Sequence, residues 1–194
     1  MLKNQLRPAV VVTVLLMLIT GIVYPGLVTA VAQLLFPRQA NGSLVVRGGR
    51  TIGSELIGQQ FAGAGYFHGR PSAAGAGYDD TLSTGTNRGP TDAKLADTLI
   101  AAAVDSAVKL DGAVPGLVPS DLATSSGSGL DPHISPAAAD LQIARVARVR
   151  RLDPAVVRAF VAQHTAGRQL GFFGEPRVNV LLLNLALDSL AGSR

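Results

Sequence analysis

An uncharged stretch near the N-terminus limits what this chain can fold into. No Asp, Glu, Lys or Arg occurs between Arg7 and Arg38, a gap of 30 positions, and twelve of the nineteen residues at 10–28 are Leu, Ile or Val. Each such side chain near a helix centre favours bilayer insertion by about 0.3–0.6 kcal/mol, or about 4–7 kcal/mol together. About 20 apolar residues span a bilayer core. We therefore predict one transmembrane helix at residues 9–36, after a short cytoplasmic tail at residues 1–8.

A cleaved signal peptide is the alternative interpretation of this stretch. Lys3 and Arg7 precede the apolar core, and Ala30-Val31-Ala32 resembles a signal-peptidase site, which would make the chain an exported binding protein. The apolar core continues to Phe36, beyond the 7–15 residues usual for a signal peptide, and this length favours an uncleaved anchor. A short cationic tail before such a core favours a cytoplasmic N-terminus. Residues 37–194 are then extracytoplasmic, attached to the cell membrane by a single pass.

The remaining residues, 37–194, are expected to form one soluble α+β domain. A short strand is predicted at Ser43–Val46, a short helix or strand at Glu55–Gly58, and an ordered loop rich in Gly, Ser and Thr at 63–90. Apolar periodicity and capping residues predict four helices: one from Thr91 to Lys109, one starting at Ser135-Pro136, one starting at Asp153-Pro154, and one over Val178–Leu190. The expected fold class is therefore α+β, with a single N-terminal transmembrane helix followed by one extracytoplasmic α+β domain.

Composition disfavours several classes of function. Charged residues make up only 15% of the chain and the mean hydropathy is +0.32, which is unusual for a cytosolic enzyme. The chain has no cysteine, and its three histidines show no metal-ligand spacing, so no metal site is expected. The net charge of +4 is scattered, so no nucleic-acid binding is expected. The one basic concentration is interpreted first as a solvated face and second as a lipid or partner contact; it comprises Arg145, Arg148, Arg150, Arg151 and Arg158.

The segment from Ser125 to Pro136 carries the densest set of reactive side chains, and three interpretations of it are open. It could hold a phosphate group near a helix N-terminus, although the chain has no Walker-type motif. It could be the active site of a membrane-anchored serine hydrolase, with Ser128 as nucleophile and His133 and Asp131 as partners. The third and favoured interpretation is a rigid turn, with Asp131 starting an Asx-turn and Ser135 capping the next helix.

Taken together, motifs along the whole chain resemble a specific family, the C subunit of the potassium-transporting P-type ATPase (Kdp complex). The matching segments are Thr20–Pro25, Ala40–Ser43, Gly53-Ser54, Ile57–Gln59, Tyr66-Phe67, Gly69–Ala73, Tyr78, Ser126–Pro136, Gln142, Arg145–Ala147 and Gly174–Leu181. Ser126–Pro136 and Gly174–Leu181 are highly specific, whereas the anchor motif alone is weak. One departure is Thr84–Asn87, where the family more often has Gly-Gly-Ser-Asn.

The resemblance implies a non-catalytic accessory subunit of an ATP-driven, high-affinity potassium uptake complex. Its implied partners are a channel-like potassium-binding subunit, a P-type ATP-hydrolysing subunit and membrane lipid. Members of the family are described as catalytic chaperones that raise the ATP affinity of the hydrolysing subunit. On that description no cofactor is bound tightly and ATP is met through the complex, at the matching positions Ser126, Gly127, Ser128, Gly129 and Gln142. This expectation conflicts with an extracytoplasmic domain, which meets almost no ATP, and the predicted topology carries more weight.

The anchor itself is expected to pack against other membrane helices. Thr20, Gly21, Pro25 and Gly26 lie close together in its second half. Small residues allow helix backbones to approach closely in a bilayer, where packing replaces the hydrophobic driving force. These four residues are therefore the predicted helix-packing site, and no catalytic residue is expected.

Overall fold

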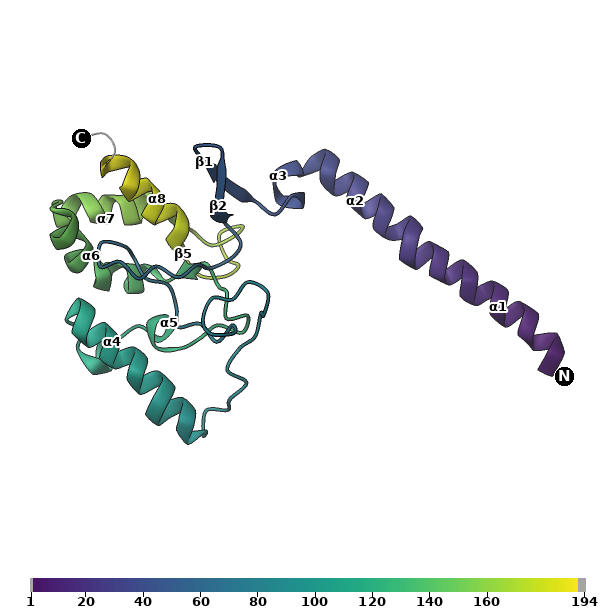
Figure 1. Ribbon diagram of the computed structural model, residues 1–194, viewed down its shortest axis with the longest axis horizontal. Helices are drawn as coiled ribbons and strands as arrows, with labels where there is room; N and C mark the ends of the chain where they lie inside the picture. Colours follow the sequence, from purple (N-terminus) through teal and green to yellow (C-terminus); the bar gives the residue numbers. More distant parts are fainter. Residues whose placement is uncertain (1, 192–194) are drawn as a thin grey trace. The chain divides into compact units, whose positions relative to one another are not determined.

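The computed structural model describes residues 2–191. Intrachain contacts divide the protein into two compact units, with the boundary in the sequence between Ser54 and Glu55. The first unit contains a long apolar helix and a β-hairpin (Figure 1). The second unit contains the other helices and a three-stranded sheet. The predicted α+β class with a single apolar N-terminal helix is confirmed.

The N-terminal helix is continuous through α1 (Leu2–Leu18), a π-helical turn (Ile19–Val23) and α2 (Tyr24–Leu35). Its apolar span, Asn4–Leu35, has 32 residues, and the most apolar 18-residue window within it has a mean hydropathy of 2.3 and is not buried in the protein. At 1.5 Å per residue this span is about 48 Å long. A bilayer core is about 30 Å thick, so the span is long enough to cross it. Residues 2–8, assigned above to a tail, are part of this helix.

After a short helix α3 (Pro37–Ala40), the first unit ends in a β-hairpin. Strands β1 (Leu44–Arg47) and β2 (Arg50–Ser54) pair antiparallel, with Leu44 opposite Ser54. Gly48 and Gly49 connect them with φ of +58° and +76°. Two consecutive positive φ angles are what a type I′ hairpin turn requires, and glycine adopts them without strain.

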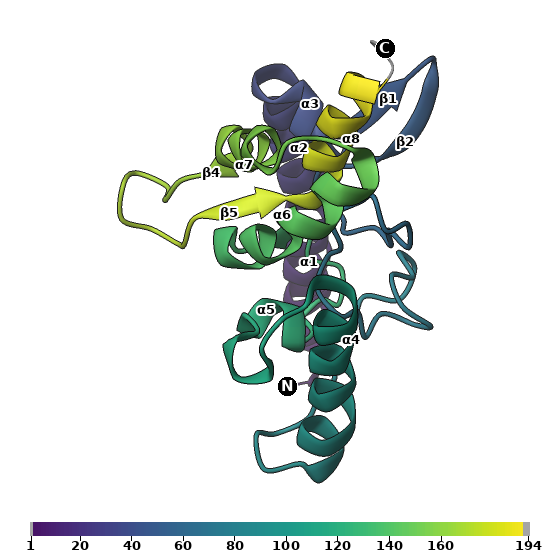
Figure 2. The ribbon, with the colours of Figure 1, turned by 90° about the vertical axis from the view of Figure 1, so that its left-hand side faces the viewer.

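The second unit is built on a small antiparallel sheet covered by helices (Figure 2). Its strands are β3 (His133–Ile134), β4 (Thr165–Ala166) and β5 (Arg177–Asn179), with β5 in the centre. Its helical elements are a π-helical segment (Lys94–Ile100), α4 (Ala101–Asp111), a 3₁₀ turn (Pro115–Leu117), α5 (Ser120–Ala123), α6 (Pro136–Arg150), α7 (Pro154–Gln163) and α8 (Val180–Ala191). Ser135 and Asp153 cap α6 and α7 as predicted, by accepting hydrogen bonds from Ala138 N and Ala155 N.

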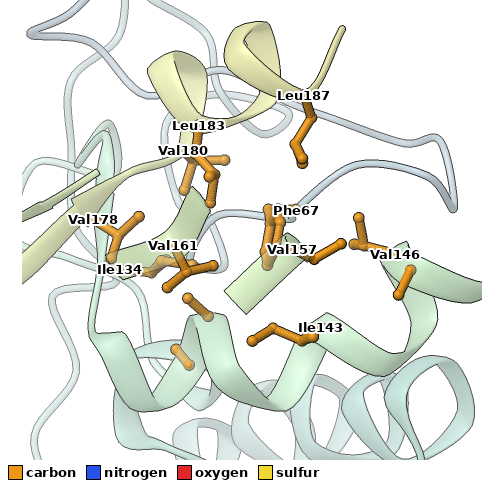
Figure 3. Packing of buried hydrophobic residues seen from close by; sticks show 13 residues of the cluster. Phe67, Ile134, Ile143, Val146, Val157, Val161, Val178, Val180, Leu183 and Leu187 are labelled. Atoms are coloured by element: carbon orange, nitrogen blue, oxygen red, sulfur yellow. The ribbon is translucent and has the colours of Figure 1, made fainter. Parts of the chain in front are cut away.

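The core of this unit lies between α6, α7, α8 and the sheet (Figure 3). Phe67, from a long loop, reaches into the centre of this cluster and is fully buried. Val157 of α7, Val178 of β5 and Leu183 of α8 are likewise inaccessible to solvent. The core therefore fixes a loop residue against three helices, which sets the path of the loop on both sides of Phe67.

Three local predictions are wrong. Glu55–Gly58 forms no helix or strand; its turn is held instead by Gly58 N, which donates to Leu130 O at 2.8 Å. The helix expected from Thr91 is capped by Asp92, whose carboxylate accepts from Lys94 N at 2.8 Å. The apolar C-terminal run begins as a strand, because residues 177–179 pair with both neighbouring strands before α8 starts.

Candidate functional site

The four predicted packing residues of the anchor lie on and beside the π-helical turn. Pro25 has no N–H, and its ring crowds the carbonyl of the residue four positions earlier, so a regular turn cannot form there. The helix widens instead, and Tyr24 N donates to Ile19 O, five residues back. Thr20 Oγ1 donates to Leu16 O at 2.7 Å, so its hydroxyl is satisfied within the helix. The anchor thus stays helical through Pro25.

Both anchor glycines face open space. Beyond the adjacent residues and the helix's own nearby backbone, a β-carbon added at Gly21 or Gly26 would meet no described atom within 4 Å. Neither glycine has a positive φ, so the chain's own conformation does not require glycine at these positions. What they provide is a shallow surface on an exposed apolar helix, which a second helix can approach closely.

In the second unit, two buried amide side chains bind consecutive residues of the long loop. Asn184 of α8 accepts from Phe67 N at 2.8 Å and donates to Phe67 O at 2.9 Å. Gln142 of α6 does the same for His68, at 2.7 Å and 3.1 Å. Each amide replaces the partner that a neighbouring strand would supply, so the backbone of this buried loop is satisfied without a sheet.

Gln142 is also joined to a buried ion pair. Its Oε1 accepts from Arg145 Nη2 at 2.8 Å, and Arg145 Nε lies 2.7 Å from Asp111 Oδ1. Arg145 Nη1 donates to the carbonyls of Ala64 and Tyr66, so the guanidinium is held by four groups. Burial and the nearby Arg145 charge lower the pKa of His68. Arg145, interpreted above as part of a solvated basic face, is buried, and this correction follows from its complete set of partners.

The serine-rich loop at 125–129 packs against the loop at 83–85. Ser83 Oγ donates to Ser128 O at 3.1 Å. Gly129 has a φ of +70°, and a β-carbon there would overlap Thr84 O and Ala74 N. Gly129 is buried, whereas Gly127 and Ser128 are exposed. The loop therefore has an anchored end at Gly129 and a solvent-facing crest at Gly127-Ser128.

Asp131 is the centre of a polar cluster beside this loop. Its carboxylate accepts from His133 N at 2.9 Å, which is the predicted Asx-turn, and from Arg70 Nη1 at 3.2 Å. Burial raises the pKa of Asp131, but hydrogen bonds from His133 and the Arg70 charge outweigh it, and the pKa is lowered. Tyr78 donates to Arg70 O at 2.6 Å; burial and the Asp131 charge raise the pKa of Tyr78 to about 12.

This geometry favours the turn interpretation over a serine hydrolase. Ser128 Oγ accepts from Leu130 N at 3.1 Å and lies 3.3 Å from Ser126 Oγ. Among the described residues no hydrogen bond joins Ser128 to His133, which faces Asp131 instead. A nucleophile needs a base within hydrogen-bond reach. The structure therefore brings two of the three proposed residues together and leaves the nucleophile apart.

A hollow of about 500 Å³ lies between α4 and the long loop. Its wall includes His68, Arg70, Tyr78, Asp111 and Gln142. Ser126–Gly129 are not among its lining residues, so the five positions matched to nucleotide contact do not share this hollow. Gln142 lies at the wall of this hollow, and its side-chain amide oxygen and nitrogen are both already hydrogen-bonded within the protein.

Comparison with known proteins gives the family. The family described as "K+-transporting ATPase, c chain" (KdpC) matches residues 6–189. The chain belongs to the KdpC family. A potassium-transporting ATPase KdpC subunit from Gemmatimonas aurantiaca is 64% identical over 193 residues, covering 99% of this chain and 96% of the relative. KdpC subunits from Methylococcus capsulatus and Rhodospirillum rubrum are each 56% identical, covering 96% and 95% of this chain and 98% and 95% of the relatives.

Membership in the KdpC family makes the chain a membrane-associated component of a potassium-transporting ATPase complex, and the resemblance stated from sequence is confirmed. Sequence reasoning missed Asn184 and Asp111 as organising residues of this KdpC chain. Asn184 had a visible signal, because it is the one polar residue in the apolar run 180–187. Asp111 had none, since its partner Arg145 is 34 positions away.

Proposed function

We propose that the chain is a non-catalytic accessory subunit that holds together a potassium-binding subunit and an ATP-hydrolysing subunit of the same complex. Membership in the KdpC family supports a role in a multi-subunit ATPase. The observation that carries the assembly role is the anchor, whose glycines at 21 and 26 leave open surface on a fully exposed apolar helix. A surface of this kind is used by membrane helices that pack closely.

The test replaces Gly21 with leucine in the full complex. Gly21→Leu fills the shallow surface and is expected to reduce co-purification of the partner subunits in detergent. Val12→Leu adds volume to the same exposed helix, away from the glycines, and is the matched control, expected to leave co-purification unchanged. Equal recovery of partners with both variants would contradict the packing role. N-terminal sequencing of the membrane-bound chain separates an anchor from an exported protein, which would begin after Ala32.

We further propose the orientation in which the N-terminus is cytoplasmic and the second unit is extracytoplasmic. The short cationic tail before the anchor supports it. The chain has no cysteine, so Leu117→Cys supplies a single label site on an exposed leucine. A membrane-impermeant maleimide should label this variant in intact cells. Labelling only after the cells are opened would contradict this orientation and place the second unit in the cytoplasm.

A second candidate role, raising the ATP affinity of the hydrolysing subunit, is proposed for the serine-rich loop and Gln142. The exposed crest at Gly127-Ser128 supports contact with a partner-bound nucleotide, because both residues face solvent and a β-carbon at Gly127 would meet nothing within 4 Å. Photo-crosslinking of labelled azido-ATP in intact membranes should then reach this chain and fall with Ser128→Ala. Complete absence of cross-linking in an active complex would exclude the nucleotide contact and agree with the proposed orientation.

A further inference from the structure

The loop that connects β4 to β5 presents an apolar tip to solvent. Leu170, Phe172 and Phe173 are 83%, 63% and 55% exposed, although each is a large hydrophobic residue. The ring centroids of the two phenylalanines are 4.1 Å apart, so the side chains form one patch. Figure 2 shows this loop projecting from the second unit beyond the sheet. An exposed apolar patch that the chain's own core does not use marks an interaction surface.

The tip is a preformed turn in which most backbone N–H groups donate to carbonyls of the same loop. Gln169 N donates to Phe173 O at 2.8 Å, and Phe173 N donates to Gln169 O at 2.9 Å. Phe172 N and Gly171 N also donate to carbonyls within the same loop. Leu170 and Gly171 have positive φ angles, which close the turn. Because these N–H groups are paired internally, their hydrogen bonds are kept when the tip enters the headgroup region, where polar groups remain to bond its carbonyls.

The arrangement of charge distinguishes a lipid surface from a protein groove. From Leu170 to Gly174 the tip has no polar side chain, whereas protein interfaces fix their register with polar groups around the apolar centre. The polar side chains lie at the base of the loop, where Arg168 pairs with Glu175 at 2.6 Å and Arg177 follows. An apolar end above a base of net positive charge matches the layers of a bilayer with anionic headgroups.

A short connection tethers the second unit to the end of the N-terminal helix. Residues 36–54 connect the end of α2 to the second unit, and even fully extended they span at most about 65 Å. A tether of this length raises the local concentration of membrane surface, which favours binding by an apolar tip whose affinity on its own would be low. We propose that the Leu170–Phe173 tip inserts into the headgroup region of the bilayer that the N-terminal helix crosses, on the side that holds the second unit.

The test uses the full chain reconstituted into vesicles of phosphatidylcholine and phosphatidylglycerol. Because the protein has no cysteine, Phe172→Cys places one environment-sensitive fluorophore at the tip. Leu117→Cys is the matched control, an exposed leucine of the same unit outside the tip (76% exposed). Spin-labelled lipid should quench the tip probe several-fold more than the control, and aqueous iodide should do the reverse. The emission of the tip probe should also shift to the blue.

The inference rests on the N-terminal helix being an anchor, so Leu16→Cys serves as an insertion control. If spin-labelled lipid fails to quench the Leu16→Cys probe, the N-terminal helix is not a membrane anchor, and the tether argument fails with it. If lipid quenches that probe while iodide quenches the tip probe, the anchor stands and the tip proposal is overturned. Shielding of the tip from both quenchers only when partner subunits are co-reconstituted would also overturn it, in favour of a protein contact.

Discussion

Arg145 and Asp111 form an ion pair in which Nε lies 2.7 Å from Oδ1, and the two side chains are only 3% and 5% exposed. The pair joins the end of α4 to the middle of α6. Arg145 also donates to Gln142 and to the carbonyls of Ala64 and Tyr66. One guanidinium therefore connects two helices to the loop that enters the core, and the arrangement of the second unit depends on it.

Removal of the carboxylate should be strongly destabilising. In Asp111→Ala the buried Arg145 loses its counter-charge, and such losses reduce the free energy of unfolding by about 3–5 kcal/mol. Asp105→Ala, at an exposed position of the same helix, should stay within about 0.5 kcal/mol of the parent. Urea unfolding of the full chain in detergent, followed by circular dichroism, measures both. Similar losses for the two variants would contradict the structural role of the pair.

Two neighbouring glycines of the serine-rich loop give a second contrast. Gly129 has a φ of +70°, and a β-carbon there would overlap Thr84 O, whereas one at Gly127 would meet nothing within 4 Å. Gly129→Ala should lower the free energy of unfolding by at least about 1–2 kcal/mol from backbone strain alone. Gly127→Ala should remain within about 1 kcal/mol of the parent. The same unfolding assay applies, and a tolerated Gly129→Ala would show that the two loops are not packed as described.

Local signals in the sequence predicted the elements whose causes are local. Ser135 and Asp153 each precede a proline and cap the helix that follows, because both the acceptor and the constrained backbone lie within a few residues. The anchor was equally predictable, since insertion depends on a sum over adjacent side chains.

Contacts between distant residues account for what could not be predicted. Gln142 was singled out by resemblance alone, and the pattern of residues could not show that its amide binds the His68 backbone, 74 positions earlier. Burial of Arg145 depends on Asp111, on a helix with no sequence link to it. An arginine-rich helix is usually a solvated one, and here tertiary contacts override that tendency.

The lowered pKa of His68 makes stability depend on pH. Burial and the Arg145 charge lower the pKa of His68 in the folded protein, so the folded imidazole takes up its proton at a lower pH than the unfolded residue, whose pKa is about 6.5. The unfolded state then binds more protons than the folded state. The contribution of His68 to the free energy of unfolding is therefore complete above pH 6.5 and is lost as the pH falls below it. The slope for one proton is at most about 1.4 kcal/mol per pH unit. His68→Gln should flatten the decline in unfolding free energy between pH 7 and pH 5, and an unchanged slope would exclude His68 as its source.

Gln142 can be tested as a structural residue independently of any nucleotide. In Gln142→Leu the N–H and C=O of His68 lose the partners that now lie at 2.7 Å and 3.1 Å. Each unsatisfied buried group costs about 1–3 kcal/mol, so the free energy of unfolding should fall by about 2 kcal/mol or more without ATP present.

Gln163→Leu, at an exposed position of α7, is the matched control for that change and should cost little. Urea unfolding in detergent measures both variants, and nucleotide cross-linking of the assembled complex is measured beside it. A Gln142→Leu protein as stable as the parent that nevertheless fails to cross-link would make this amide a ligand group, because only a direct contact could then explain the loss.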